Sequence, residues 1–582
     1  MEKSNRTNRI VVGIDFGTAG IGYAFDFQGG NPRSIILSDF PGQSADHKVP
    51  SEIILDNYLE DVLAFGEECN SYITPSDRDK SSYEYFKNIK MNLYEGIYRI
   101  KSTNGKEANI ELVISKLLKK VAENAISQIE RSTISFKREE IKWVVTIPAI
   151  WDEKSKDIMI NASIKAGLIG ENDDKSLFLA LEPEAAGIYY YLSFLHDKKT
   201  YDKLIQDNTP YIVCDIGAGT VDLCTQKRIV NHNETAELIE EYPPIGGDYG
   251  GKKINKEFIN RLIVEIFGEE KVKNIQTNSN KSKRWIQFEK DIEEIKIACC
   301  QNENCNLTLN CYLFKDNSEK TLDDYIGDYN KKQIRYKYEI KRQDEWELEF
   351  PSQIFYDIIK ELSKQIFLKI EEIYNNVHTR YILLTGAGSK NHVITHYLYD
   401  FAKEKNISLN IVTPSNPEIS IIKGAVLYGF QRNIIRKRKA KYTLGIGISR
   451  KWDDKYQGRG EKIYNELEKE YKCNNLFSKF ITINQYINFD DVITQNYYAL
   501  DKNQPITFYK TTKINCTYKD EKDENGQLVI HKFGDVTFHI CEDFDVNDRR
   551  ITIQMKLGGT YIDACAIYEK TGRRLNIVKS FY

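Results

Sequence analysis

The chain contains two similar segments, each an apolar strand-like run that ends in an aspartate and a glycine-rich turn. The first reads Ile-Val-Val-Gly-Ile-Asp-Phe-Gly-Thr-Ala-Gly at residues 10–20, and the second reads Tyr-Ile-Val-Cys-Asp-Ile-Gly-Ala-Gly-Thr at residues 211–220. Their aspartates, Asp15 and Asp215, lie 200 residues apart. A repeat at this distance predicts two related lobes rather than a short-period solenoid.

Strand-like and helix-like segments alternate around these two turns. Apolar residues at helical spacing predict helices at residues 111–131, 152–166 and 352–376. Short apolar runs predict strands at residues 143–147, 178–181 and 381–385. This alternation predicts an α/β fold with largely buried sheets.

The character of the chain changes after residue 430. The basic run from Arg432 to Lys441 is interpreted as a solvated linker, with a nuclear signal or a patch for an anionic surface as alternatives. From residue 442 the segments are short and strand-like, for example at residues 442–448, 480–487 and 551–557. We therefore predict a separate all-β module over residues 442–582.

Composition excludes several classes of protein. The 582 residues carry 82 Lys and Arg against 85 Asp and Glu, and this near-neutral balance argues against a chain-wide, specific nucleic-acid binder. No apolar run is long enough for a membrane span, so none is expected. The eleven cysteines include no C-x-x-C pair, which predicts free thiols in a reducing compartment and hence a cytoplasmic location.

The residues of the aspartate turns are suited to binding Mg²⁺ and phosphate. An aspartate there can hold Mg²⁺ or the waters around it, while the N–H groups of the turn approach phosphate oxygens. Two such turns facing each other would clamp a polyphosphate from both sides, and Thr18 and Thr220 would add hydroxyl donors. A pair of ordinary hairpins, in which glycine only provides positive φ, is the alternative.

Further motifs follow in a fixed order along residues 9–430. They are Val-Thr-Ile-Pro-Ala at 145–149, Glu-Pro-Glu-Ala-Ala at 182–186, Gly-Gly-Asp at 246–248 and Leu-Thr-Gly-Ala-Gly at 384–388. With the two aspartate turns, this series resembles the nucleotide-binding domain of the heat-shock 70 kDa proteins, within the actin-like ATPase superfamily. Trp151 and the loop at residues 246–251 are most similar to the divergent heat-shock 70 kDa protein 12 subfamily.

The resemblance implies an architecture. It implies an actin-like two-lobed ATPase domain, a duplicated ribonuclease-H-like fold, with lobes over residues 1–208 and 209–430. A linker over residues 431–441 would lead to a β-sandwich over residues 442–582. The chain stops soon after the closing hairpin of that module, so we expect no helical lid and quick release of any bound peptide.

The resemblance also implies ATP or ADP with Mg²⁺ as cofactors and assigns roles to individual residues. Asp15, Glu182, Asp215 and Thr220 would be catalytic, and Asp15 and Asp215 would hold Mg²⁺ through water. The nucleotide would contact Gly17, Thr18, Gly217, Ala218, Gly219, Gly246, Gly247, Asp248, Glu293, Lys296, Gly386, Ala387 and Gly388.

Two departures from the family pattern concern the same site. Asn70 stands where the family has a lysine that contacts the terminal phosphate, and Ile297 stands where it has an arginine that stacks on adenine. Lys87 and Lys90 lie downstream, and nothing in the sequence places either at the phosphate. Because a missing cation leaves developing negative charge unbalanced, we expect ATP binding with slow or absent hydrolysis.

The functional alternatives stay open at this point. An atypical chaperone-like protein would bind a protein or peptide through the β module and cooperate with co-chaperones. A nucleotide-sensing scaffold or regulator would use the same parts without cycling. A small-molecule kinase of the same superfamily is the third reading, although no motif for a catalytic aspartate or an acceptor pocket is found.

Overall fold

The structure is a computed structural model. It describes residues 10–27, 31–41, 47–73, 82–132, 135–170, 173, 175–196, 206, 208–230, 236–277, 282–299, 305–316, 320–466, 468–499, 503–539, 549–557 and 563–576. Residues 577–582 lie outside this set, so the predicted absence of a lid concerns a part of the chain that the structure does not describe. Within the described residues, no helix combines the length and the apolar composition that a membrane crossing requires.

Two sheets repeat one arrangement of strands. The first has the order β11 (Leu177–Leu181), β10 (Ile141–Ile147), β1 (Ile10–Phe16), β2 (Gly20–Asp26) and β3 (Ile36–Leu37), with β4 (Val49–Pro50) also paired to β2. The second begins β20 (Asn410–Val412), β19 (Tyr381–Thr385), β12 (Pro210–Ile216), β13 (Val221–Val230) and β14 (Ala236–Ile239), with β15 (Ile245–Gly247) also paired to β13. In each sheet three parallel strands are followed by two antiparallel ones. This duplication fits a two-lobed actin-like fold.

Two helices lie between the sheets. They are α5 (Glu182–His196) and α14 (Ser420–Phe430), and their side chains share one buried cluster with residues of β1 and β12. The helices approach very closely, since a Cβ on Gly424 would lie 1.7 Å from the carbonyl oxygen of Ala185. The two halves are therefore joined by a common core and not only by a covalent hinge.

The remaining helices cover the outer faces of the sheets. In the first half these are α3 (Ile110–Ser132) and α4 (Glu153–Lys165), and in the second α7 (Gly251–Phe258), α12 (Gln353–Val377) and α13 (His392–Glu404). The helices predicted at residues 111–131, 152–166 and 352–376 and the strand at 381–385 are confirmed to within one residue. Asp152 begins α4 as its N-cap, because its carboxylate accepts the N–H of Ser155.

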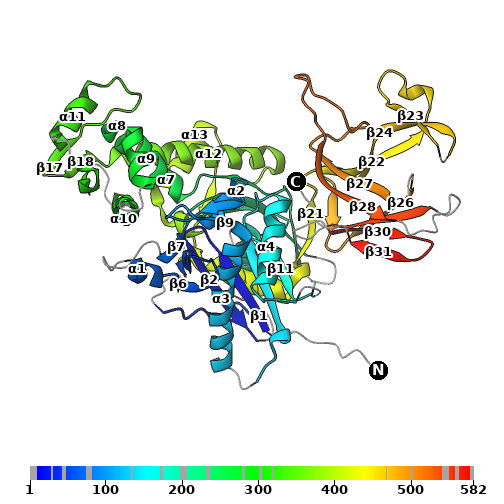
Figure 1. The fold of residues 1–582 in the computed structure, drawn as a ribbon, viewed down its shortest axis with the longest axis horizontal. Coiled ribbons are helices and arrows are strands. Elements are labelled where there is room, and N and C mark those ends of the chain that lie inside the picture. The colour runs from blue at the N-terminus through cyan, green and yellow to red at the C-terminus, as the bar shows by residue number, and fades with distance from the viewer. Residues whose placement is uncertain are drawn as a thin grey trace.

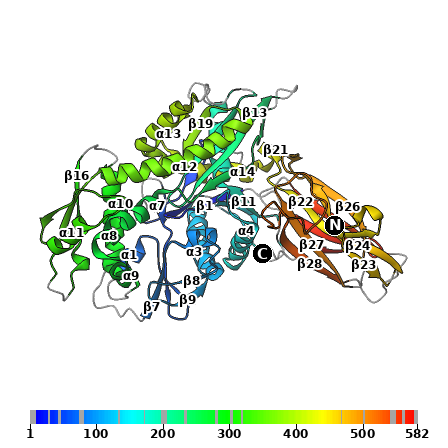
Figure 2. The same cartoon turned by 90° about the horizontal axis from the view of Figure 1, so that it is seen from above.

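Smaller elements extend each half. The first half adds β5 (Ile53–Asp56), β6 (Val62–Phe65), α1 (Glu68–Ile73), β7 (Tyr83–Phe86), α2 (Ile89–Tyr94), β8 (Arg99–Lys101) and β9 (Glu107–Asn109). The second adds α8 (Val264–Phe267), α9 (Glu269–Thr277), α10 (Ser282–Cys299), β16 (Asn306–Asn310), α11 (Leu322–Lys331), β17 (Lys341–Asp344) and β18 (Glu347–Pro351). Figures 1 and 2 both place α11, β17 and β18 at the end of the molecule opposite the C-terminal strands.

The C-terminal part consists of two antiparallel sheets that share one hydrophobic cluster. One has the order β23 (Lys462–Asn465), β24 (Glu470–Ile481), β22 (Thr443–Lys451), β27 (Asn503–Thr511) and β28 (His531–His539). The other has the order β26 (Val492–Tyr498), β29 (Arg550–Lys556), β30 (Asp563–Tyr568) and β31 (Arg573–Asn576). Ile446 and Phe508 from the first sheet pack with Ile553 and Met555 from the second.

One predicted strand of this part is wrong. Residues 480–487 do not form a single strand, because a turn at residues 482–485 separates β24 from β25 (Tyr486–Asn488). Gln485 donates its N–H to the carbonyl oxygen of Thr482 and closes this turn. The strand β25 then leaves the C-terminal sheets and joins the second sheet of the α/β part, next to β21 (Ile435–Lys439).

The basic run is not a solvated linker, and this corrects the interpretation from sequence. Its strand β21 pairs with β14 on one side and with β25 on the other, so it is part of the second sheet. Figure 1 shows it between the α/β part and the C-terminal strands. Arg438 is buried and holds Glu184 with two hydrogen bonds, of 2.9 and 2.7 Å, from Nε and Nη2. Burial and the charge of Glu184 raise the pKa of the neighbouring Glu240 well above its usual range.

Removing the Arg438 charge should therefore destabilise the protein. Arg438→Met leaves Glu184 buried without its cation, and the cost should be about 3–5 kcal/mol. The matched control is Arg436→Met, since Arg436 is exposed on the same strand and its loss should stay within about 0.5 kcal/mol. Urea unfolding of both variants measures the difference. Equal effects of the two substitutions would contradict a structural role for the buried pair.

Candidate functional site

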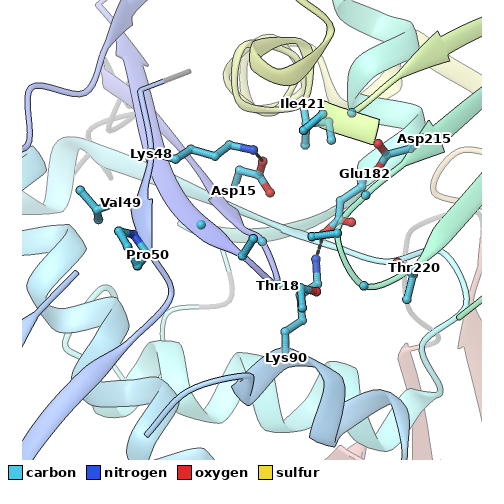
Figure 3. Close-up of a pocket in the computed structure, with 18 of the residues that line it drawn as sticks. Asp15, Thr18, Lys48, Val49, Pro50, Lys90, Glu182, Asp215, Thr220 and Ile421 are labelled. Carbon is cyan, nitrogen blue, oxygen red and sulfur yellow. Dashed lines mark hydrogen bonds and ion pairs between the residues drawn. The ribbon is translucent and has the colours of Figure 1, made fainter. Parts of the chain in front are cut away.

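A cavity of about 250 Å³ lies where the two aspartate turns meet. Figure 3 shows acidic and basic side chains converging on it from both halves of the α/β part. Eleven of the residues predicted from sequence line it: Asp15, Gly17, Thr18, Glu182, Asp215, Gly217, Ala218, Gly219, Thr220, Gly386 and Ala387. The structure thus brings together residues that are as far as about 370 positions apart in the chain.

The two turns face each other at contact distance. A Cβ on Gly219 would lie 2.5 Å from Oγ1 of Thr18 in the opposite turn, so only glycine fits there. The carbonyl groups of Gly217 and Ala218 point away from the first turn, because they accept N–H groups from the start of α7. Within the described residues, the N–H groups of Ala218 and Gly219 have no hydrogen-bond partner. Free N–H groups beside a cavity can bind the oxygens of an anion.

Asp15 sits at the end of β1 and is held by two partners. Lys48 lies 2.6 Å from Oδ2, and the hydroxyl of Thr146 on β10 donates to Oδ1 at 3.0 Å. Burial alone would raise the pKa of Asp15, but the positive charges of Lys48 and Lys90 outweigh it, so the pKa is lowered. The ionised form of Asp15 is therefore favoured.

Glu182 begins α5 directly after β11 and pairs with Lys90 on α2. Both side chains are almost fully buried, and Figure 3 shows Lys90 rising from its helix toward Glu182. Burial raises the pKa of Glu182 to about 7, an effect that Lys90 opposes and Asp15 reinforces. A carboxyl group with a pKa near neutrality can exchange a proton with a ligand or a water at physiological pH.

Asp215 is the acid of the second turn, and one of its oxygens is orphaned. Burial raises its pKa well above the usual range, and the charges of Glu182, Asp222 and Asp15 add to this. Its Oδ1 is buried and makes no hydrogen bond within the described residues. Gly386 lies against this atom with φ of 77°, and a Cβ there would be only 2.2 Å from Oδ1.

The donor set fits a hydrated divalent cation. Two carboxylates from the two turns, Asp15 and Asp215, both line the cavity, and the orphaned Oδ1 offers an acceptor for a coordinated water. Oxygen ligands and retained waters are what Mg²⁺ prefers. A bound cation would also relieve the repulsion that raises the pKa of Asp215.

Six predicted site residues lie outside the set that lines the cavity: Gly246, Gly247, Asp248, Glu293, Lys296 and Gly388. Gly246 and Gly247 form β15 and pair with β13, while Asp248 pairs with Lys253. Glu293 and Lys296 pair with each other at 2.7 Å, and Lys296 also donates to the carbonyl of Gly251 beside the second turn.

Sequence reasoning missed the two basic residues of the cavity as site residues. Lys48 precedes β4 and Lys90 lies on α2, so neither is near an aspartate turn in sequence. Asp222, which accepts the hydroxyl of Thr220 at 2.7 Å, was also missed. Asp222 lies two residues after the second turn motif and could have been found there, whereas no local pattern marks the two lysines.

Lys252 links the two halves beside the cavity. It lies at the start of α7 and donates to the carbonyl oxygen of Thr18, at 3.3 Å, and to Oδ1 of Asn88. Burial lowers the pKa of Lys252 to about 8, although Glu52, Glu289 and Glu293 oppose this shift. The first turn is thereby tied to the second half through a cation whose charge changes at mildly alkaline pH.

The fold and the site together fit the two-lobed actin-like class of proteins. Comparison with known proteins adds relatives at this point. The chain is 23% identical to heat shock 70 kDa protein 12A of Mus musculus over 556 residues, covering 84% of this chain and 79% of that protein. It is 23% identical to heat shock 70 kDa protein 12B of Homo sapiens over 552 residues, covering 84% and 78%.

Heat shock 70 kDa protein 12A of Homo sapiens is 22% identical over 638 residues, covering 98% of this chain and 91% of that protein. No family model matches the chain. The relatives confirm the resemblance to the heat-shock 70 kDa protein 12 subfamily that the motifs predicted.

The Lys252 link should make stability depend on pH. Below pH 8 Lys252 is charged in both states, and burying this charge destabilises the folded state. This penalty disappears as the pH rises toward 10.5, the pKa of the lysine in the unfolded chain. The unfolding free energy of the wild type, relative to Lys252→Met, should therefore rise between pH 8 and 10. Urea unfolding at several pH values measures it, with the exposed Lys273→Met as control. Parallel pH profiles of wild type and Lys252→Met would contradict it.

Proposed function

We propose that the chain binds Mg-ATP or Mg-ADP between its two aspartate turns and hydrolyses ATP slowly. The observation that carries the proposal is the pair of facing turns, with two free N–H groups on one and an orphaned carboxylate oxygen beside them. Similarity to heat-shock 70 kDa proteins over most of the chain supports it.

Each residue of the cavity has a part in this proposal. The N–H groups of Ala218 and Gly219 and the hydroxyl of Thr18 bind phosphate oxygens. Asp15 and Asp215 would hold a hydrated Mg²⁺ through its waters, and the ion would supply positive charge that neutralises the phosphates. Glu182, at the start of α5, orients the attacking water and can accept its proton.

The cavity is smaller than most ligand sites, which measure about 300–1,000 Å³. A bound polyphosphate would compete with Asp15 and Glu182 for Lys48 and Lys90. The binding of a protein or peptide by residues 442–582, with or without co-chaperones, stays a prediction. A nucleotide-sensing regulator that does not cycle uses the same cavity and differs only in turnover.

Calorimetry with Mg-ATP and Mg-ADP tests nucleotide binding. Asp215→Asn should weaken Mg-ATP binding by about tenfold or more, because the water-binding carboxylate of the second turn is lost. In EDTA the same substitution should have little effect. The control is Asp39→Asn, an exposed aspartate that pairs with Arg131 outside the cavity. Absence of saturable nucleotide binding by the wild type, or equal binding by Asp215→Asn with Mg²⁺, would contradict the proposal.

Single-turnover hydrolysis tests the slow rate. Asn70 accepts a hydrogen bond from Lys290 at 2.7 Å and lies beside Glu67, which lines the cavity. Asn70→Lys should raise the hydrolysis rate by about tenfold or more, because it restores the lysine that the heat-shock 70 kDa pattern has for the terminal phosphate. Asn70→Gln lengthens the side chain without adding charge and should leave the rate unchanged. A wild-type rate equal to that of ordinary chaperones, or an unchanged Asn70→Lys rate, would count against it.

A further inference from the structure

The cavity is lined by more acidic than basic side chains. Among the described residues that line it, four are acidic, namely Asp15, Glu67, Glu182 and Asp215, and two are basic, namely Lys48 and Lys90. A polyphosphate adds several further negative charges. Mg²⁺ offsets part of them, so the anion enters favourably only where a lysine turns from its carboxylate to a phosphate oxygen.

The two lysines differ in burial and in the acids that their charges affect. Lys48 pairs with Asp15, the ionised carboxylate of the first turn, and its side chain is 15% exposed. Lys90 is 4% exposed, and its positive charge acts on all four buried acids of the site: Asp15, Glu182, Asp215 and Asp222. Lys90 is therefore the more buried of the two lysines, and its charge acts on acids of both turns.

The position of α2 places Lys90 between the two turns. Its neighbour Met91 lies against the second turn, since a Cβ on Gly219 would be 2.4 Å from Sδ of Met91 and 2.5 Å from Oγ1 of Thr18. Asn88, just before the helix, binds Lys252 of the other half. The helix is thus fixed to both halves, and Figure 3 shows the Lys90 ammonium group close to Glu182, where the lobes meet.

We propose that Lys90 is the cation that binds the terminal phosphate of ATP in this cavity and so distinguishes ATP from ADP. In this role Lys90 would replace the lysine that the heat-shock 70 kDa pattern has at the position of Asn70. This inference rests on the proposed nucleotide function. When Lys90 turns to the phosphate, Glu182 loses its partner and is free to bind water, so nucleotide binding and the release of Glu182 are one event.

The test compares two lysines three residues apart. Lys87 lies just before α2, pairs with Glu289 at 2.5 Å and is outside the set that lines the cavity. Calorimetry measures binding of Mg-ADP and of the magnesium complex of the β,γ-imido analogue of ATP to wild type, Lys90→Met and Lys87→Met. Lys90→Met should weaken binding of the analogue by about tenfold or more and leave ADP binding within about twofold. Lys87→Met should change neither.

Two further variants keep the result interpretable. Lys90→Arg retains the charge and should keep a preference for the analogue over ADP. Lys90→Met with Glu182→Gln removes both buried charges, so it should fold as the wild type does by circular dichroism and still lack the preference.

Equal weakening of both nucleotides, or an unchanged preference in Lys90→Met, would overturn the role of Lys90 while leaving nucleotide binding intact. A wild type that binds neither nucleotide would instead overturn the proposed function itself. The two failures are therefore distinguishable.

Discussion

The burial of several carboxylates in one small space is the constraint on which the centre of the structure depends. The site contains four buried acids, namely Asp15, Glu182, Asp215 and Asp222. The negative charges of neighbouring acids raise the pKa values of Glu182 and Asp215. Such a cluster is unfavourable unless cations, hydrogen bonds or protonation balance it. Lys48 and Lys90 supply part of this balance, and raised pKa values supply the rest. A site that is left short of positive charge is well suited to a ligand that brings its own cation.

The same constraint explains why the two halves are held so closely. Lys90 belongs to the first half but also acts on Asp215 and Asp222 of the second, so this part of the charge balance forms only when the halves meet. Lys252 crosses in the opposite direction to Thr18 and Asn88. The shared core around α5 and α14 joins the two halves, and these polar contacts link them beside the cavity.

The sequence predicted features whose residues are neighbours in the chain, and it missed contacts that only the folded chain brings together. The aspartate turns and the helices of regular periodicity were predictable, because the residues that define them are neighbours in the chain. Lys48 and Lys90 were not, since only the fold brings them to the turns. The interpretation of the basic run was wrong for a related reason, since charge runs are usually solvated. The two acids that act on Arg438 are Glu184 and Glu240, which lie about 250 and 200 residues away in the chain. The predicted strand at residues 480–487 was wrong because apolar content alone does not reveal the turn within it.

The first turn of α5 connects the cavity to the C-terminal part through two residues. Glu182 pairs with Lys90 in the cavity, and Glu184, two positions later, holds Arg438 of β21 with two hydrogen bonds. The strand β21 in turn pairs with β25, which the C-terminal part contributes to the second sheet. Tyr486 of β25 also donates its hydroxyl to Glu241 next to the buried pair, at 2.6 Å. Because a helix turn is rigid on the scale of these contacts, a displacement of Glu182 would also shift Glu184 and its contact with β21, the strand that pairs with β25.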